Sequence, residues 1–323
     1  MTGRSGRYEG DSWDPACNVG ATATMIATYR ALASQGPDAL LNDRLADPLV
    51  RAVGLEQFVR LLDGEIAFED DPLLRRAEAN RQIAVRTRFF DNFCLTATDA
   101  GVRQAVILAS GLDTRAYRLP WPDEMVVYEI DQPLVIDFKT WTLAELGADP
   151  TADRRPIGID LRDDWPAALH QHGFDANKPT AWIVEGLLIY LPPDAQDRLF
   201  DSIASLSVPT SQLATEHFPD PVGLTGEHAQ QLSARWSRMG LDLDMSELVY
   251  SGDRHTVIEY LTMHGWQLTA RTIKELYAHN GFEFPDDDTA AVFGELSLVA
   301  ATFAGADAAC PANAGRDGPG GVR

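Results

Sequence analysis

The sequence has few cysteines and no long apolar run. Its three cysteines, Cys17, Cys94 and Cys310, lie far apart, which excludes a disulfide framework and a paired-cysteine metal site. No apolar run approaches the roughly 18 residues of a membrane-spanning helix, and the first residues lack the apolar segment of an export signal. These absences favour a cytoplasmic protein without a membrane anchor.

Basic residues are also scarce. The 27 Lys and Arg residues face 48 Asp and Glu residues, and the formal net charge is −21. Such a chain repels phosphate backbones and anionic lipid surfaces, so nucleic acid and membranes are unexpected partners. With 323 residues, of which 45% are hydrophobic, the chain has enough apolar material for one large domain or two modest ones.

The pattern of apolar residues changes near residue 100. Before it, Val19 to Ala33 and Pro72 to Asp99 show helical spacing. After it, short apolar runs alternate with helical segments at Pro133–Leu146, Trp165–Gln171 and Pro193–Ser205. This alternation predicts an α/β fold, with a mostly parallel sheet covered by helices on both faces. The seven expected strands are Ala105–Ala109, Met125–Ile130, Arg155–Ile159, Ala181–Glu185, Gln212–His217, Trp266–Arg271 and Glu295–Phe303.

These patterns divide the chain into three parts. Residues 1–100 form a helical cap that helps to build the substrate region, and residues 101–304 form the sheet domain. Within the latter, residues 219–253 interrupt the alternation and read either as a lid over the ligand edge or as a packing helix. Residues 305–323 are rich in Gly, Ala and Pro and are expected to be a disordered tail.

Small and acidic residues follow the first four expected strands. The first strand ends at Ser110 and Gly111, the second at Asp131, the third at Asp160 and the fourth at Glu185. In an open α/β sheet the ligand lies beyond the carboxyl ends of the strands. The four ends therefore predict one acidic ligand edge, which needs a cationic or donor-rich ligand.

The turn after the first strand lacks a phosphate-binding fingerprint. It reads LASGLD, and of the glycines in GxGxxG only Gly111 is present. S-adenosylmethionine suits this edge better than a dinucleotide, because it has a sulfonium cation and no phosphate. Asp131 can accept both ribose hydroxyls, Asp160 can accept from the adenine amine beside the Leu161 backbone, and Glu185 lies toward the methionine end.

Six segments carry a resemblance to a known family that runs from about Trp13 to Phe303. The chain resembles the leucine carboxyl methyltransferase family, and within it an actinobacterial group of S-adenosylmethionine-dependent methyltransferases. The segments, in chain order, are SWDPACNVGATA at 12–23, RTRFFDNF at 86–93, VILASGLDTRAYRL at 106–119, YEIDQPLVIDFK at 128–139, DLRDDWPAAL at 160–169 and VEGLLIYLPPDAQDRLF at 184–200.

The resemblance implies a class I methyltransferase fold, in which the seventh strand runs antiparallel between the fifth and the sixth. It implies cofactor contacts at Gly111, Asp131, Asp160, Leu161 and Glu185. It also implies that an arginine of the RTRFF segment holds the cofactor carboxylate; Arg86 and Arg88 both fit, with a slight preference for Arg88.

One position departs from the family pattern. Many members have LGAGLDT, where this chain has Ala109 at the first glycine. A methyl group is tolerated there if φ is negative. Asp113 and Arg115, which follow, are expected to pair locally or to cap the next helix.

The expected catalytic residues are few. A carboxylate acceptor, which the family name suggests, is ionised at neutral pH and needs no general base. Tyr190 is the candidate for lining the acceptor side, with a packing role equally open. His217 is a candidate base toward a hydroxyl acceptor, although a lone histidine is more often structural. The other histidines show no metal-ligand spacing with Cys or acids, so no metal is expected.

The acceptor stays open at this point. A protein C-terminus, a small carboxylic acid and a polyketide-like or lipid acid are all compatible with the sequence. Two alternatives to methyl transfer also remain: a non-catalytic cofactor-binding protein and a nicotinamide-dependent oxidoreductase, the second of which the LASGLD turn disfavours.

Overall fold

The fold is that of a computed structural model of the chain. It describes residues 18–35, 39–66, 76–218, 248–250, 252–287 and 293–305, together with residues 230, 233, 234 and 237. The expected tail at 305–323, apart from Gly305, and most of the expected lid at 219–253 lie outside the described residues.

Seven strands form one sheet in the order β3-β2-β1-β4-β5-β7-β6. The first five are parallel, and β7 runs antiparallel between β5 and β6. This is the strand order and direction that the family resemblance implies. The strands are β1 (Gln104–Leu108), β2 (Val126–Asp131), β3 (Asp153–Gly158), β4 (Ala181–Val184), β5 (Gln212–His217), β6 (Trp266–Thr272) and β7 (Ser297–Phe303).

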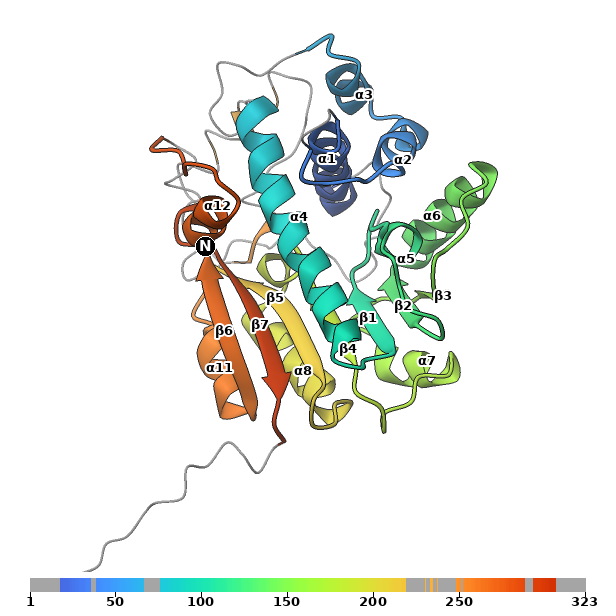
Figure 1. The fold of residues 1–323 in the computed structure, drawn as a ribbon, viewed down its shortest axis with the longest axis vertical. Coiled ribbons are helices and arrows are strands. Elements are labelled where there is room, and N and C mark those ends of the chain that lie inside the picture. Colours follow the sequence, from blue (N-terminus) through green and yellow to red (C-terminus); the bar gives the residue numbers. More distant parts are fainter. Residues whose placement is uncertain are drawn as a thin grey trace, which may run out of the picture.

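Helices cover both faces of the sheet (Figure 1). Along β1, Val106 and Leu108 pack into one apolar cluster, whereas Ala105 and Ile107 pack into another on the opposite face, as the period of two in a strand requires. The first cluster receives α7 (Trp165–Gln171), α8 (Pro193–Ser205) and α11 (Val257–Met263); the second receives α4 (Arg76–Asp99), α5 (Arg115–Arg118) and α12 (Ile273–His279). A further helix, α6 (Pro133–Glu145), packs beside β2 and β3.

The N-terminal helices lie beyond the carboxyl ends of the parallel strands (Figure 1). They are α1 (Asn18–Ala33), α2 (Ala46–Val53) and α3 (Glu56–Leu62), and they share a third apolar cluster with Ile83 of α4 and Leu112 of the turn after β1. The helices expected before residue 100 are therefore present. The long helix α4 also contacts β4, β5 and β7, so it covers the sheet as well as the ligand edge.

No helix among the described segments is long and apolar enough to cross a membrane.

Candidate functional site

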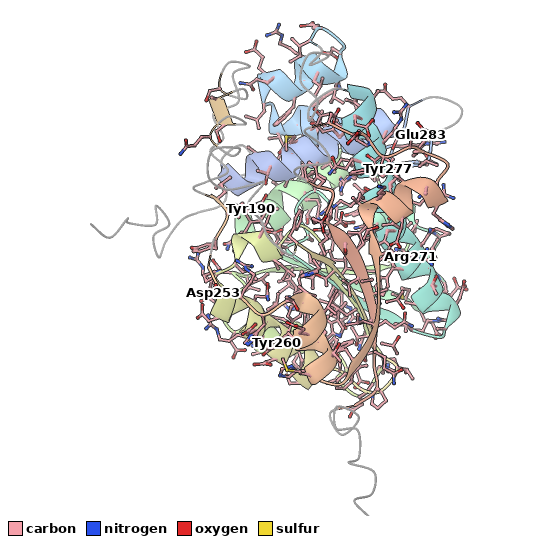
Figure 2. The ribbon with its side chains drawn as sticks, turned by 90° about the vertical axis from the view of Figure 1, so that its left-hand side faces the viewer. Tyr190, Asp253, Tyr260, Arg271, Tyr277 and Glu283 are labelled. Carbon is pink, nitrogen blue, oxygen red and sulfur yellow. The ribbon has the colours of Figure 1, made fainter. Side chains whose placement is uncertain are left out.

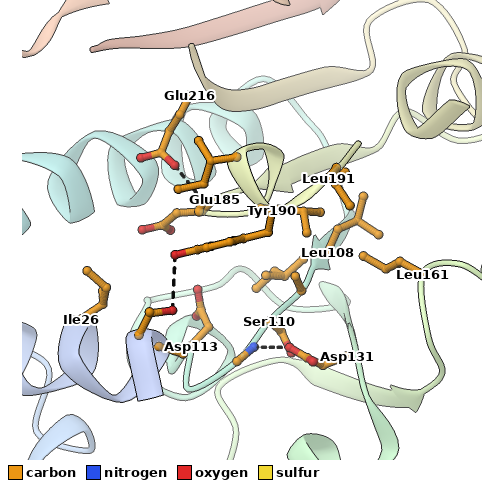
Figure 3. Close-up of a pocket in the computed structure, with 18 of the residues that line it drawn as sticks. Ile26, Leu108, Ser110, Asp113, Asp131, Leu161, Glu185, Tyr190, Leu191 and Glu216 are labelled. Atoms are coloured by element: carbon orange, nitrogen blue, oxygen red, sulfur yellow. Dashed lines mark hydrogen bonds between the residues drawn. The ribbon is translucent and has the colours of Figure 1, made fainter. Parts of the chain in front are cut away.

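A cavity of about 850 Å³ lies at the carboxyl ends of the central strands. The sheet order reverses between β1 and β4, and this switch point is where open α/β sheets bind their ligands. The cavity is lined by the ends of β1 and β4, by the segments after β2 and β3, and by residues of α1 and α4. Figure 3 shows Asp131 and Leu161 on one side of it, Glu185 and Glu216 on another, and Tyr190 between them.

The turn after β1 brings backbone to the cavity. Gly111 has a φ of 44° and Ala109 a φ of 53°, both in the left-handed region. The condition for tolerating a methyl group at Ala109, a negative φ, is therefore not met. The chain turns at Ala109 while the next residue stays paired with β2, since the Ser110 N–H donates to the carbonyl of Ile130 at 3.0 Å. The alanine methyl group is accepted at the cost of backbone strain.

Replacing Ala109 by glycine should relieve this strain. Glycine adopts positive φ without a Cβ penalty, so we expect Ala109→Gly to raise the free energy of unfolding by about 0.5–1 kcal/mol. Urea denaturation of the two proteins measures the difference. Ala27→Gly, inside α1, where Ala27 is buried, is the control and should destabilise. A loss of stability in Ala109→Gly as large as in the control would contradict the strain.

Asp131 closes β2 and faces this turn. Its Oδ2 accepts the Gly111 N–H at 2.6 Å and its Oδ1 accepts the Gln132 N–H at 2.7 Å. Burial raises the pKa of the Asp131 carboxyl above its usual value, and these two hydrogen bonds oppose the shift. Each oxygen accepts one backbone N–H and keeps a lone pair for a second donor, which is the capacity that a pair of ribose hydroxyls needs.

Asp160 and Leu161 line the cavity beyond β3. Burial alone would raise the pKa of the Asp160 carboxyl, but hydrogen bonds from Arg162 and Gln132 hold that pKa below its usual value. The Gln132 amide donates at 2.6 Å and the Arg162 guanidinium at 2.5 Å. Asp160 is thus a fixed carboxylate, and Leu161 adds an apolar surface beside it.

Glu185 follows β4 within a buried network of opposite charges. Its two oxygens accept from Arg86 at 2.7 Å and from Arg115 at 2.6 Å. Arg86 also forms a two-point contact with Glu216 at the end of β5, and Glu216 accepts the Gly186 N–H at 2.7 Å. Burial lowers the pKa of Arg86, but Glu216 and Glu185 more than reverse this, so Arg86 stays charged.

Asp113 and Arg115 form an ion pair, and the Arg115 N–H donates to the Asp113 carboxylate. This confirms their expected local pairing. Both side chains are buried and Asp113 lines the cavity, so the pair supports the site from behind the turn.

The structure separates the two arginines of the RTRFF segment. Arg86 is buried and lines the cavity, whereas Arg88, two residues further along α4, is exposed and is not among the lining residues. Two residues in a helix differ by roughly 200° in direction, so only one of them can face the sheet. The preference for Arg88 does not fit this geometry, and Arg86 is the one placed to meet a ligand.

The two candidate catalytic residues lie in different places. Tyr190 lines the cavity, and its hydroxyl donates to the Thr22 hydroxyl of α1 at 3.4 Å. His217 is buried at the end of β5 and borders a separate small cavity of about 40 Å³. Burial lowers the pKa of His217, which favours a neutral ring. His217 is not among the lining residues of the large cavity, so the structure places its side chain outside that cavity.

Three residues at the site were not predicted from the sequence. Glu216 is the penultimate residue of β5, next to His217, so a search for acidic residues near the strand ends could have found it. Arg30 of α1 pairs with Asp43 at 3.0 Å and donates to the Leu112 carbonyl. Lys139, fully buried on α6, pairs with Glu129 at 3.0 Å and donates to Ser110 and Asp113. Only tertiary packing reveals the last two.

Comparison with known proteins shows where this chain belongs. A family model described as leucine carboxyl methyltransferase matches residues 23–204, which include the turn after β1, Asp131, Asp160 and Glu185. The chain belongs to the leucine carboxyl methyltransferase family. Membership of this family favours methyl transfer over the nicotinamide alternative.

Relatives in mycobacteria cover nearly the whole chain. A protein of Mycobacterium marinum is 68% identical over 91% of this chain and 97% of its own length, and one of Mycobacterium avium is 63% identical over 93% and 98%. Both bear the name "Putative S-adenosyl-L-methionine-dependent methyltransferase". A solved structure from Thermobifida fusca covers 86% of this chain and 94% of that chain with 23% identity and a TM-score of 0.48, which adds nothing to the family assignment.

Proposed function

We propose that this protein transfers the methyl group of S-adenosylmethionine to a carboxylate oxygen of its acceptor. Membership of the leucine carboxyl methyltransferase family and the mycobacterial relatives make the chain an S-adenosylmethionine-dependent methyltransferase. The carboxylate as acceptor is the finer step, and it follows from the kinds of side chain that face the cavity.

The cavity residues fit this cofactor. Asp131 would accept the ribose hydroxyls with the lone pairs that its backbone donors leave, and Asp160 with Leu161 would meet the adenine. Ser110 and Gly111 would border the methionine half, where Gly111 has the positive φ that glycine adopts without strain. Arg86 keeps N–H groups beyond those bound by Glu216 and Glu185, and these can bind the cofactor carboxylate. Bound there, the cofactor supplies an activated methyl group on a cationic sulfur.

One observation carries the choice of a carboxylate. The described residues that line the cavity include no His, Lys or Cys. Glu185 and Glu216 are held by Arg86, and the Tyr190 hydroxyl is bonded to Thr22. A hydroxyl or ammonium acceptor needs a base to take its proton, whereas a carboxylate is already ionised at neutral pH. The protein then has to orient the acceptor and exclude water, which Tyr190 and the apolar residues beside it can do.

A matched pair of acceptors tests this proposal. The full chain is incubated with methyl-labelled S-adenosylmethionine and either hexanoic acid or 1-hexanol, which share their apolar body. We expect label only with the acid, in a methyl ester that mild base hydrolyses to methanol. Label in a base-stable ether from the alcohol, with none from the acid, would overturn the carboxylate assignment.

The ribose contact gives a prediction about the cofactor. In Asp131→Asn one carboxylate oxygen becomes an amide N–H₂ group, which cannot accept from the backbone N–H that faces it or from a ribose hydroxyl. We expect S-adenosylmethionine to bind about tenfold to a hundredfold more weakly, because hydrogen bonds to a charged group contribute about 1.5–3 kcal/mol. Isothermal titration calorimetry measures the affinity. Asp137→Asn, an exposed position on α6, is the control, and equal affinities in the two variants would remove Asp131 from the ribose site.

A further inference from the structure

The cavity extends beyond the residues assigned to the cofactor. Its far part is bordered by α1, α4 and the residues around β5 and β7, with Met25, Ile26, Tyr29, Ile83, Phe218 and Phe293 among its lining. In Figure 3, Ile26 lies across the cavity from Leu161, and the Tyr190 ring reaches between the two sides toward α1. The part of the cavity that faces the N-terminal helices is therefore predominantly apolar.

The cations that line the cavity already hold carboxylates. Among its described lining residues are four arginines: Arg30 pairs with Asp43 at 3.0 Å, and Arg86 pairs with Glu185 and Glu216. The other two, Arg162 and Arg198, pair with Asp160 and Asp194 at 2.5 Å each. The same lining includes seven carboxylates. Beyond the cofactor carboxylate assigned to Arg86, a ligand that brings further negative charge would meet only arginines that already hold a carboxylate.

We infer that the acceptor is an apolar monocarboxylic acid, whose uncharged body lies against the side chains of α1 and α4. This inference rests on the proposed function. The single carboxylate of such an acid faces the sulfonium, the cationic group that carries the methyl group to be transferred. Among the described residues of the far part, the cation is Arg30, which already holds Asp43, so a second carboxylate or a phosphate would be left without a counter-ion. The polar backbone of a long peptide would lie mostly against apolar side chains.

The chemistry of the transfer favours the same class. The acceptor oxygen displaces the thioether, so an O–CH₃ bond forms as the S–CH₃ bond breaks, and the electron pair of the broken bond stays on sulfur. One anion and one cation become a neutral ester and a neutral thioether. Because both charges disappear, apolar surroundings stabilise the transition state relative to the separated ions.

A series of acids tests the inference. With methyl-labelled S-adenosylmethionine and the full chain, kcat/KM is measured for butanoate, hexanoate, octanoate, octanedioate and a tetrapeptide that ends in leucine. We expect kcat/KM to rise about threefold to fourfold per methylene, because each buried methylene contributes about 0.8 kcal/mol. Octanedioate should react at least about a hundredfold more slowly than octanoate, because its second carboxylate would be buried unpaired, and the peptide should react more slowly than octanoate.

A variant of α1 tests whether the preference for apolar acids arises in the far part of the cavity. Ile26 lines the cavity and is half-buried, so Ile26→Glu places a carboxylate in the far part of the cavity. We expect octanoate methylation to fall by about a hundredfold, as burying an unpaired charge costs several kcal/mol, while the calorimetric affinity for S-adenosylhomocysteine stays unchanged. Ile26→Val, which keeps this position apolar, is the control and should methylate octanoate nearly as fast as the unchanged protein.

The outcomes separate this inference from the proposed function. If acids are methylated but octanedioate or the peptide reacts as fast as octanoate, or chain length has no effect, the apolar acceptor is wrong and carboxylate methylation stands. If S-adenosylhomocysteine binds and none of the acids is methylated while 1-hexanol is, the carboxylate assignment fails and the inference falls with it.

Discussion

Arg86→Met should destabilise the protein by about 3–5 kcal/mol, because it removes the shared partner of two largely buried carboxylates. The Glu185 and Glu216 side chains are 14% and 8% exposed, and both are paired with Arg86. Glu185 keeps Arg115 and Glu216 keeps the Gly186 N–H, but neither contact replaces the central guanidinium. Urea denaturation measures the loss.

The same substitution should weaken cofactor binding. If Arg86 holds the carboxylate of S-adenosylmethionine, its loss costs about tenfold to a hundredfold in affinity, as expected for a charge-assisted hydrogen bond. Calorimetry without urea and at low temperature, where the variant is still folded, measures the cofactor affinity separately from the loss of stability. Arg86→Lys keeps the charge but not the two-point contact with Glu216, so it should recover only part of both losses.

Arg88→Met is the matched control, with the same change two residues along the same helix. Arg88 is exposed, so its removal should alter stability by no more than about 0.5 kcal/mol and leave cofactor affinity unchanged. A larger loss of affinity in Arg88→Met than in Arg86→Met would reverse the assignment of the two arginines.

Lys139→Met should have the second-largest effect, a destabilisation of about 3 kcal/mol. Lys139 and Glu129 are both 0% exposed and lie 3.0 Å apart. Arg154, which pairs with Glu129 at 2.7 Å, is still present in the variant. The expected loss of stability is therefore at the lower end of the range for breaking a buried ion pair. Methionine fills nearly the same volume, so the change reports the lost charge and not a cavity.

Lys139 also supports the turn that borders the cofactor. Its ammonium donates to the Ser110 hydroxyl and to the Asp113 carbonyl, both at 3.2 Å. Without these donors the turn is less well ordered, so S-adenosylmethionine should bind several-fold more weakly. Lys274→Met, an exposed position on α12, is the control for both measurements. If Lys139→Met is destabilised but binds the cofactor with unchanged affinity, Lys139 stabilises the core and has no role in cofactor binding.

Local patterns were enough to predict the strands. The expected strands after residue 104 became β1 to β7 with boundaries shifted by two residues or fewer at either end, because most of the runs are short, apolar and bounded by turn residues or charge. Strand direction at β7 came from the family resemblance. The positions that end the first four strands also followed from the runs, because parallel strands deliver their carboxyl ends to one edge.

The sequence by itself determined the elements of the sheet, the acidic edge at Asp131, Asp160 and Glu185, and the family. These depend on residues that are close together in the chain. Only the tertiary structure decided that Arg86 faces the cavity and Arg88 faces outward, that Ala109 has a positive φ, and that Glu216 and Lys139 belong to the site. The reason is physical: the rotation of α4 on the sheet and the pairing of charges 130 residues apart are set by packing between elements, and no local pattern encodes them.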